Sequence, residues 1–252
     1  MIDEDLDNLL VSLRLQKDAE GIGLFMLQME KEDHCSPLHA FREGLRYIAK
    51  KRQEKKAATW MTTARFPSGL FATPFDPKLC PISTKKLSEL VGLTWLERGE
   101  NLLLSGPTGL GKTLLSVHLG KQAVAKGYRT FFIEERALAD RLNDARNTGA
   151  AAYRRQMQHF RSQDLLILDD VGRVGERCEG FCEILHARHS ERKSTIITTN
   201  QKLAHWACDE SLSLHLRAST DRFLEFAHHY NLTGKSLRLQ AYERINSLAL
   251  SK

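Results

Sequence analysis

Short runs of apolar residues alternate along the chain with stretches in which apolar residues recur every three or four positions. The runs are typical of buried strands, and the wider spacing is typical of amphipathic helices. The pattern predicts strands at 102–104, 130–133, 165–168 and 194–200, with helices between them. Because strands and helices alternate, we expect an α/β fold in which helices flank a parallel sheet on both faces.

The first part of the chain shows only helical spacing, and residues 1–64 are predicted to form a small helical N-terminal module. Leucines at 6, 9, 10 and 13 mark one helix, and Ser36-Pro37 is a typical N-cap followed by proline at the first helical position. The second helix carries six basic residues between 46 and 56. This basic run is either a solvated helix face or a contact surface for nucleic acid or an acidic partner.

Four of the six prolines lie at 67, 74, 77 and 81, which predicts an irregular connector at 65–82 and a second domain at 83–252. The net charge of +6 is compatible with binding a polyanion. The acidic first residues and the lack of a long apolar run argue against a signal peptide and a membrane span. Five scattered cysteines without a C-x-x-C pair favour a reducing, cytoplasmic location.

The turn after the first strand of the second domain has the pattern G-x-x-x-x-G-K-[ST], which is typical of loops that bind nucleotide phosphates. Glycines allow successive N–H groups to point into one concavity, which the N-terminus of the next helix closes. Lysine reaches the phosphates, and the hydroxyl after it ligates Mg²⁺. The residues expected to bind ATP here are Gly106, Pro107, Thr108, Gly109, Leu110, Gly111, Lys112 and Thr113.

Polar residues end two later strands. Asp169 is expected to hold Mg²⁺ together with Thr113, because this ion prefers oxygen ligands and α/β sheets bind ligands at the carboxyl ends of their strands. Asp170 is the candidate that orients and deprotonates the attacking water. Asn200 is either a turn residue or a contact to the terminal phosphate or the water.

These motifs together resemble those of IstB-like transposition helper ATPases, a group of AAA+ proteins related to DnaC-type helicase loaders. The resemblance runs from residue 102 to residue 238. Its carriers are GPTGLGKT, LLILDDVG, STIITTN with Trp206 after it, the pair Asp221-Arg222 and the segment Gly234 to Arg238. The family resemblance implies an AAA+ P-loop NTPase domain at 83–252 with a short or absent lid.

The resemblance also implies roles that spacing does not reveal. Asn200 resembles the sensor-1 residue, Arg222 resembles an arginine finger that acts on a neighbouring subunit, and Arg238 resembles the sensor-2 arginine. Arg217 is a second candidate for the finger. A further expectation is contact with DNA by an arginine-rich helical region, comprising Arg136, Arg141, Arg146, Arg154, Arg155 and Arg161.

The expected function is therefore that of a Mg²⁺-dependent ATPase that assembles as a homo-oligomer on double-stranded DNA and assists a transposase. Two alternatives stay open, a replicative helicase loader and an ATP-gated DNA scaffold with very slow hydrolysis. Asp170 stands where relatives usually carry glutamate, and the shorter side chain withdraws the carboxylate by about 1.5 Å. Slow hydrolysis is the expected consequence.

Overall fold

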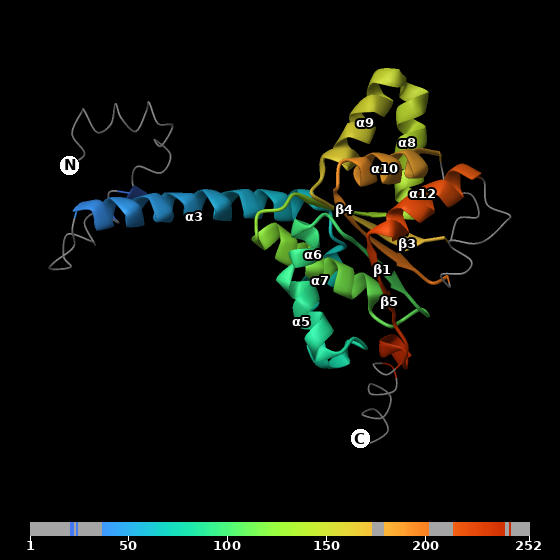
Figure 1. Ribbon diagram of the computed structural model, residues 1–252, viewed down its shortest axis with the longest axis horizontal. Coiled ribbons are helices and arrows are strands. Elements are labelled where there is room, and N and C mark those ends of the chain that lie inside the picture. The colour runs from blue at the N-terminus through green and yellow to red at the C-terminus, as the bar shows by residue number, and fades with distance from the viewer. Residues whose placement is uncertain are drawn as a thin grey trace, which may run out of the picture. The chain divides into compact units, whose positions relative to one another are not determined.

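A computed structural model of the 252-residue chain describes residues 21–22, 24, 37–172, 179–201, 214–239 and 242 (Figure 1). By its internal contacts the chain divides into two compact units, Met1–Thr59 and Trp60–Lys252. The predicted domain limits at 64/65 and 82/83 stay predictions. The predicted leucine-rich first helix and the capping Ser36 lie outside the described residues.

Helix α3, Pro37–Thr63, begins at the predicted proline and carries the whole basic run of residues 46–56. Some of its side chains form ion pairs within the helix, between Arg46 and Glu43 and between Lys51 and Glu54. Exposed pairs of this kind contribute little to stability. They are compatible with both interpretations of the basic run.

A five-stranded parallel sheet forms the centre of the second unit, with the strand order β2-β3-β4-β1-β5 (Figure 1). The first four strands occupy the four predicted positions, so the predicted parallel α/β fold is confirmed. The strands are β1 (Asn101–Ser105), β2 (Thr130–Glu134), β3 (Leu165–Val171), β4 (Ser194–Thr199) and β5 (Ala227–Asn231).

Alternate side chains of these strands enter two separate hydrophobic cores. In β1, for example, Leu102 and Leu104 belong to one core and Leu103 belongs to the other. Successive side chains of a strand point to opposite faces, so each strand needs apolar residues at every position when both faces are covered. This requirement explains why β1 to β4 contain continuous apolar runs rather than alternating patterns.

Helices from different parts of the chain cover the two faces (Figure 1). One core includes residues of α5 (Thr84–Gly92), α6 (Thr94–Glu97) and α7 (Lys112–Ala125). The other core includes residues of α8 (Glu135–Thr148), α9 (Ala150–Ser162), α10 (Glu179–Ser190) and α12 (Leu214–Glu225).

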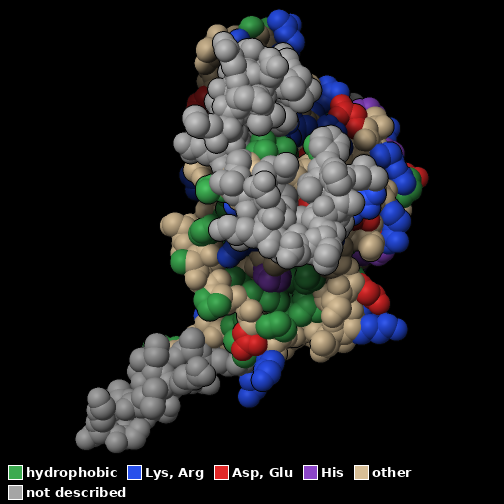
Figure 2. All heavy atoms as spheres, turned by 90° about the vertical axis from the view of Figure 1, so that its left-hand side faces the viewer, with side chains coloured by type: hydrophobic (Ala, Val, Ile, Leu, Met, Phe, Trp, Pro, Cys, Tyr) green, Lys and Arg blue, Asp and Glu red, His purple; other side chains and the backbone are tan. Residues whose placement is uncertain are grey.

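The proline-rich segment contains two short helices, α4 (Ser68–Ala72) and the 3₁₀ helix η2 (Pro77–Leu79). Phe75 of this segment stacks on His118 of α7 with a centroid distance of 4.3 Å. Burial and the nearby Lys121 lower the pKa of His118. Figure 2 shows one face of the molecule, with hydrophobic side chains gathered in its lower part and Lys and Arg side chains along one edge. Because Phe75 stacks on His118, the segment packs on α7 instead of running free as a linker.

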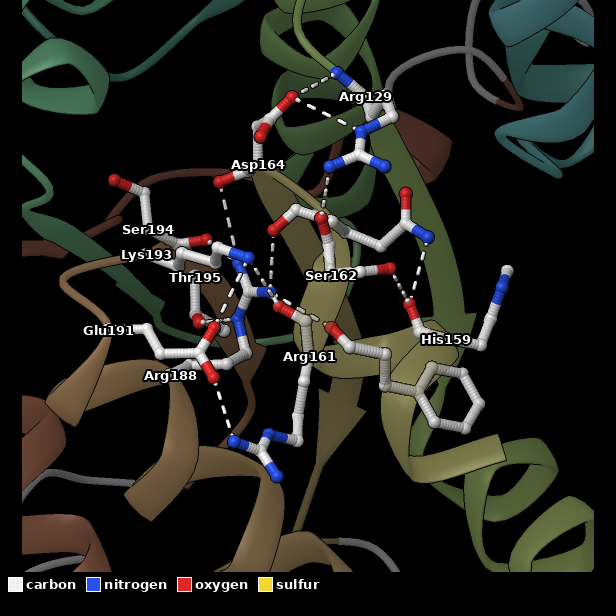
Figure 3. Close-up of polar contacts among 12 residues, drawn as sticks. Arg129, His159, Arg161, Ser162, Asp164, Arg188, Glu191, Lys193, Ser194 and Thr195 are labelled. Carbon is white, nitrogen blue, oxygen red and sulfur yellow. Dashed lines mark hydrogen bonds and ion pairs between the residues drawn. The ribbon is translucent and has the colours of Figure 1, made fainter. Parts of the chain in front are cut away.

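Arg188 of α10 is fully buried and connects the start of β4 to the end of α9 (Figure 3). Its guanidinium donates to the carbonyl oxygens of Phe160 at 2.9 Å, Gln163 at 2.8 Å and Ser194 at 2.5 Å. Its Nε atom donates to the hydroxyl of Thr195 at 3.0 Å. Burial lowers its pKa to about 9. Arg188 thus supplies donors to carbonyl groups at the C-terminus of α9, which the helix itself leaves unpaired.

None of the helices in the described part of the chain combines the length and the apolar character that a membrane span needs.

Candidate functional site

The phosphate loop, residues 106–111, lies between β1 and α7. Gly106, Gly109 and Gly111 have φ angles of 134°, 86° and 82°, which side chains other than glycine rarely adopt. A Cβ atom on Gly106 would lie 2.2 Å from the backbone oxygen of Leu232. The N-terminus of α7 has no side-chain cap, so its first N–H groups can bind an anion.

Lys112 is the first residue of α7, and its ammonium group lies inside the phosphate loop. The Nζ atom donates to the carbonyl oxygens of Gly106 at 2.6 Å and Pro107 at 2.8 Å, and to Oδ1 of Asn200 at 2.7 Å. Only 8% of the residue is exposed. A buried positive charge and the uncapped amides of a helix N-terminus therefore meet in one place, which suits a phosphate group.

Thr113 and Asp169, the pair predicted to hold Mg²⁺, are in contact. The hydroxyl of Thr113 donates to Oδ2 of Asp169 at 3.1 Å, and the hydroxyl of Thr198 donates to Oδ1 at 2.6 Å. Burial raises the pKa of the Asp169 carboxyl, Asp170 and Glu134 raise it further, and the two hydroxyl donors oppose this effect. A cation near these oxygens would favour the ionised carboxylate.

The donors at this position fit Mg²⁺, which prefers oxygen ligands and keeps several waters when bound. Within the described ranges of the chain, no group of three or more His, Cys, Asp or Glu residues could hold a metal by itself. Mg²⁺ here would depend on Thr113 and Asp169 together with phosphate oxygens and water. Mg²⁺ sites formed with substrate phosphates commonly have this arrangement.

Asp170 and Asn200, the candidates for water activation, are hydrogen-bonded to each other. The Nδ2 atom of Asn200 donates to Oδ1 of Asp170 at 3.0 Å. Asn200 therefore bridges Lys112 and Asp170 with its two amide atoms. Asp170 has a positive φ of 58°, a left-handed conformation that Asp tolerates better than most residues. The structure thus brings together five sequence-predicted residues, Lys112, Thr113, Asp169, Asp170 and Asn200.

A pocket of about 210 Å³ opens beside the phosphate loop. The segment after β5 forms one wall, and its Leu237 N–H donates to the carbonyl oxygen of Gly109 at 2.8 Å. The lining residues are Lys78, Leu79, Cys80, Pro81, Leu110, Thr233, Gly234, Lys235 and Leu237. Sequence reasoning assigned no such pocket, because its walls come from three segments that no local pattern connects.

Arg222 and Arg238, to which the family resemblance gave roles, lie outside this network. Arg222 is exposed in the last turn of α12, and Arg238 is exposed beyond β5. Neither side chain makes a hydrogen bond or ion pair within the described residues. Thr198 is a site residue that sequence reasoning missed, although its position two residues before Asn200 on a strand could have indicated that both face the same side.

Comparison with known proteins agrees with this geometry. The profile of a family described as IstB-like ATP binding protein matches residues 13–244. The chain is 33% identical over 195 residues to the ATP-binding protein of insertion sequence IS21 from Pseudomonas aeruginosa, covering 75% of this chain and 72% of that protein. It is 29% identical over 192 residues to the ATP-binding protein of insertion sequence IS5376 from Geobacillus stearothermophilus, covering 75% and 76% of the two chains.

Two solved structures are similar in fold. The DnaC helicase loader is 26% identical with a TM-score of 0.50, and the match covers 59% of this chain and 87% of that chain. DnaI is 19% identical with a TM-score of 0.54, over 68% of this chain and 94% of that chain. At the lower identity the similarity concerns the fold alone.

Proposed function

The chain belongs to the family of IstB-like ATP binding proteins, and we propose that it hydrolyses MgATP while assembled on double-stranded DNA and assists a transposase. Its fold is the predicted AAA+ P-loop fold. The observation that carries the ATPase proposal is the continuous hydrogen-bonded set that connects Lys112 through Asn200 to Asp170 beside the Thr113–Asp169 pair.

The phosphate loop would hold the phosphates of ATP with its backbone N–H groups and with Lys112. To do so, the Lys112 ammonium exchanges the carbonyl oxygens of Gly106 and Pro107 for phosphate oxygens. Thr113 and Asp169 would hold Mg²⁺, which when bound neutralises charge on the phosphates. The base would occupy the pocket beside the loop, between the η2 segment and the segment after β5.

Asp170 and Asn200 would position the attacking water. The Asp170 carboxylate accepts its proton, and Asn200 orients it or contacts the terminal phosphate. The carboxylate of Asp170 is withdrawn by about one methylene compared with glutamate and is bonded to Asn200. Slow hydrolysis follows, since a general base acts only within hydrogen-bond reach of its water.

Assembly would complete the site through Arg222. Its exposure on α12 leaves its guanidinium accessible to a neighbouring subunit, where it would neutralise charge on the phosphates, while Arg238 would act on nucleotide in its own chain. A mixing experiment tests this. Lys112→Ala and Arg222→Ala should each be inactive alone, and their mixture should recover part of the ATPase rate. A mixture as inactive as its components contradicts an arginine supplied by a second subunit.

DNA contact is proposed for the arginines of α8 and α9 that are not engaged within the protein. Arg146 lies 3.7 Å from Glu183, and Arg161 lies 2.8 Å from Glu191, so both are partly neutralised. Arg141 and Arg155 instead line a pocket of about 300 Å³ between the two helices. Arg141 is only partly exposed, and its guanidinium lies 5.5 Å from the ring centroids of both Phe131 and Phe160. Phosphate contacts require accessible positive charge, which favours the exposed Arg155.

Adjacent arginines provide a matched test of this surface. Arg155 lines the pocket between α8 and α9, whereas its neighbour Arg154 is exposed and does not line it. Arg155→Gln should weaken binding to duplex DNA and reduce its salt dependence, because one phosphate contact is lost. Arg154→Gln removes the same charge from the same helix and should weaken binding less. Equal effects of the two variants would contradict a contact in this pocket.

Two alternatives keep support. The similarity to the DnaC helicase loader favours a loader that binds a replicative helicase. The shorter, Asn200-bound Asp170 favours an ATP-gated scaffold that hydrolyses very slowly. Purified transposase and replicative helicase, offered side by side to the immobilised full chain with ATP, separate the first alternative from our proposal. Retention of the helicase alone would contradict a role in transposition.

A further inference from the structure

The pairing of β3 with β4 changes register next to the two carboxylates. Between Leu168 and Val171, two residues of β3, Asp169 and Asp170, face one residue of β4, Thr198. This arrangement is a β-bulge, in which the extra residue loses its regular partner in the ladder. Bulges are frequent beside active sites because they redirect side chains.

Thr198 compensates for the bulge with its side chain. Its hydroxyl oxygen accepts a hydrogen bond from the backbone N–H of Asp170 at 2.9 Å. The same hydroxyl donates its proton to Oδ1 of Asp169 at 2.6 Å. A threonine hydroxyl has one donor and two acceptor positions, so the bond to Asp169 uses its only proton and the bond from Asp170 uses one acceptor position. With 1% of the residue exposed, water cannot easily replace either bond.

Each bond fixes one carboxylate. With Oδ1 of Asp169 bound to Thr198, the other oxygen, Oδ2, lies 3.1 Å from the Thr113 hydroxyl, where Mg²⁺ is expected. The bond to the Asp170 amide holds this residue in its left-handed conformation, with φ of 58°. In that conformation the Asp170 carboxylate lies 3.0 Å from Asn200.

We propose that Thr198 is the positioning residue of the site, whose single hydroxyl orients the Mg²⁺-binding Asp169 and fixes the backbone of the water-activating Asp170. This role rests on the proposed ATPase function. Residues that orient metal ligands commonly change metal affinity or activity by 10-fold to 100-fold when they are replaced.

Two substitutions separate the hydroxyl from the packing of the side chain. Thr198→Val keeps the branched shape and loses both hydrogen bonds, whereas Thr198→Ser keeps the hydroxyl and loses a buried methyl group. A positioning role predicts that valine is the harmful change. A role in packing alone predicts the opposite order, because serine leaves the larger void.

The neighbouring Thr199 is a matched control. It is equally buried and also makes two hydrogen bonds, to the carbonyl oxygen of Val171 at 2.7 Å and from the backbone N–H of Gln201 at 3.1 Å. Neither of these bonds involves Asp169 or Asp170. Thr199→Val therefore reports the cost of losing a buried threonine hydroxyl from the same strand without disturbing the carboxylates.

The test measures the affinity of a fluorescent ATP analogue in EDTA and in Mg²⁺, together with the ATPase rate and the thermal midpoint. Thr198→Val should bind the analogue normally in EDTA, lose about 10-fold to 100-fold of the affinity gained with Mg²⁺, and lose turnover to a similar extent. Thr198→Ser and Thr199→Val should keep the gain with Mg²⁺. Thermal midpoints identify any variant that has lost its fold.

The outcomes distinguish this role from the proposed function. A normal response to Mg²⁺ in wild type and in Thr198→Val overturns the role of Thr198 and leaves the ATPase proposal intact. The role is also overturned if Thr199→Val loses the gain in analogue affinity with Mg²⁺ to the same degree as Thr198→Val, because the effect is then not specific to the carboxylates. A wild-type chain that binds no ATP overturns both proposals.

Discussion

Gly106→Ala provides a quantitative test of the phosphate loop, because a second glycine offers the same strain without the steric conflict. Gly106 and Gly149 have similar φ angles, 134° and 129°. A Cβ atom on Gly149 meets nothing within 4 Å, whereas a Cβ atom on Gly106 meets the backbone oxygen of Leu232 at 2.2 Å. The two substitutions therefore share the backbone cost, on the order of 1–3 kcal/mol, and differ in the clash.

The clash at Gly106 cannot be relieved by a side-chain rotation. A carbon and an oxygen atom approach to about 3.3 Å, so the two segments must separate by roughly 1 Å. Leu232 is itself held by its N–H bond to the carbonyl oxygen of Ser105 at 2.8 Å. We expect Gly106→Ala to lose roughly 1–3 kcal/mol of unfolding free energy more than Gly149→Ala.

Urea denaturation followed by circular dichroism measures the difference between the two variants. Affinity for a fluorescent ATP analogue should fall for Gly106→Ala and stay close to wild type for Gly149→Ala, which lies between α8 and α9. Equal denaturation midpoints and equal nucleotide affinities would refute the steric argument and the placement of the segment after β5 against the loop.

Three further predictions concern other parts of the second unit. Asp170→Glu should raise ATP turnover by about tenfold, as part of the 10²–10⁴ that a positioned base contributes; a rate that stays near background would favour the scaffold. Arg188→Met should cost at least about 3 kcal/mol in urea denaturation, since it leaves several buried carbonyl groups unpaired; a loss below 1 kcal/mol would contradict this. Burial lowers the pKa of His118, His159 and His229, so the unfolded chain takes up protons below about pH 6.5 before the folded chain does. The thermal midpoint should therefore decrease as the pH is lowered from 7.5 to 5.5, and the decrease should be smaller in His118→Gln.

The sequence predicted strands β1 to β4 because each is almost entirely buried and contains a short apolar run. It did not predict β5, whose residues are Ala227, His228, His229, Tyr230 and Asn231. This strand lies at the edge of the sheet, and most of its side chains are at least partly exposed. Unlike β2 at the other edge, which is buried at four of its five positions, β5 is exposed enough to need no apolar run, so its pairing with β1 is decided by tertiary contacts.

The phosphate loop could be predicted because all of its determinants lie within eight residues. The contacts of Lys112 with Asn200 and of Asn200 with Asp170 could not be predicted in the same way, because they depend on the strand order. Strand β4 lies between β3 and β1, and this order brings Asn200 between Asp170 and the loop. A linear sequence does not specify which strands are neighbours.

Charge was the least informative feature of the sequence. Arg146 and Arg161 belong to the arginine-rich region expected to contact DNA, yet each also pairs with a glutamate of the α10 region more than twenty residues away. Arg188 lies outside that region and uses its charge for buried carbonyl groups. The number of arginines therefore says little about binding until the internal partners of each are known.

The most direct test of the central claim is the ATPase rate with and without duplex DNA, at low and high salt, for wild type, Lys112→Ala and Arg222→Ala. We predict that DNA stimulates the wild type, that high salt abolishes the stimulation, and that both substitutions remove activity. ATP binding without any response to DNA, and with no effect of Arg222→Ala, would contradict an ATPase that assembles on DNA.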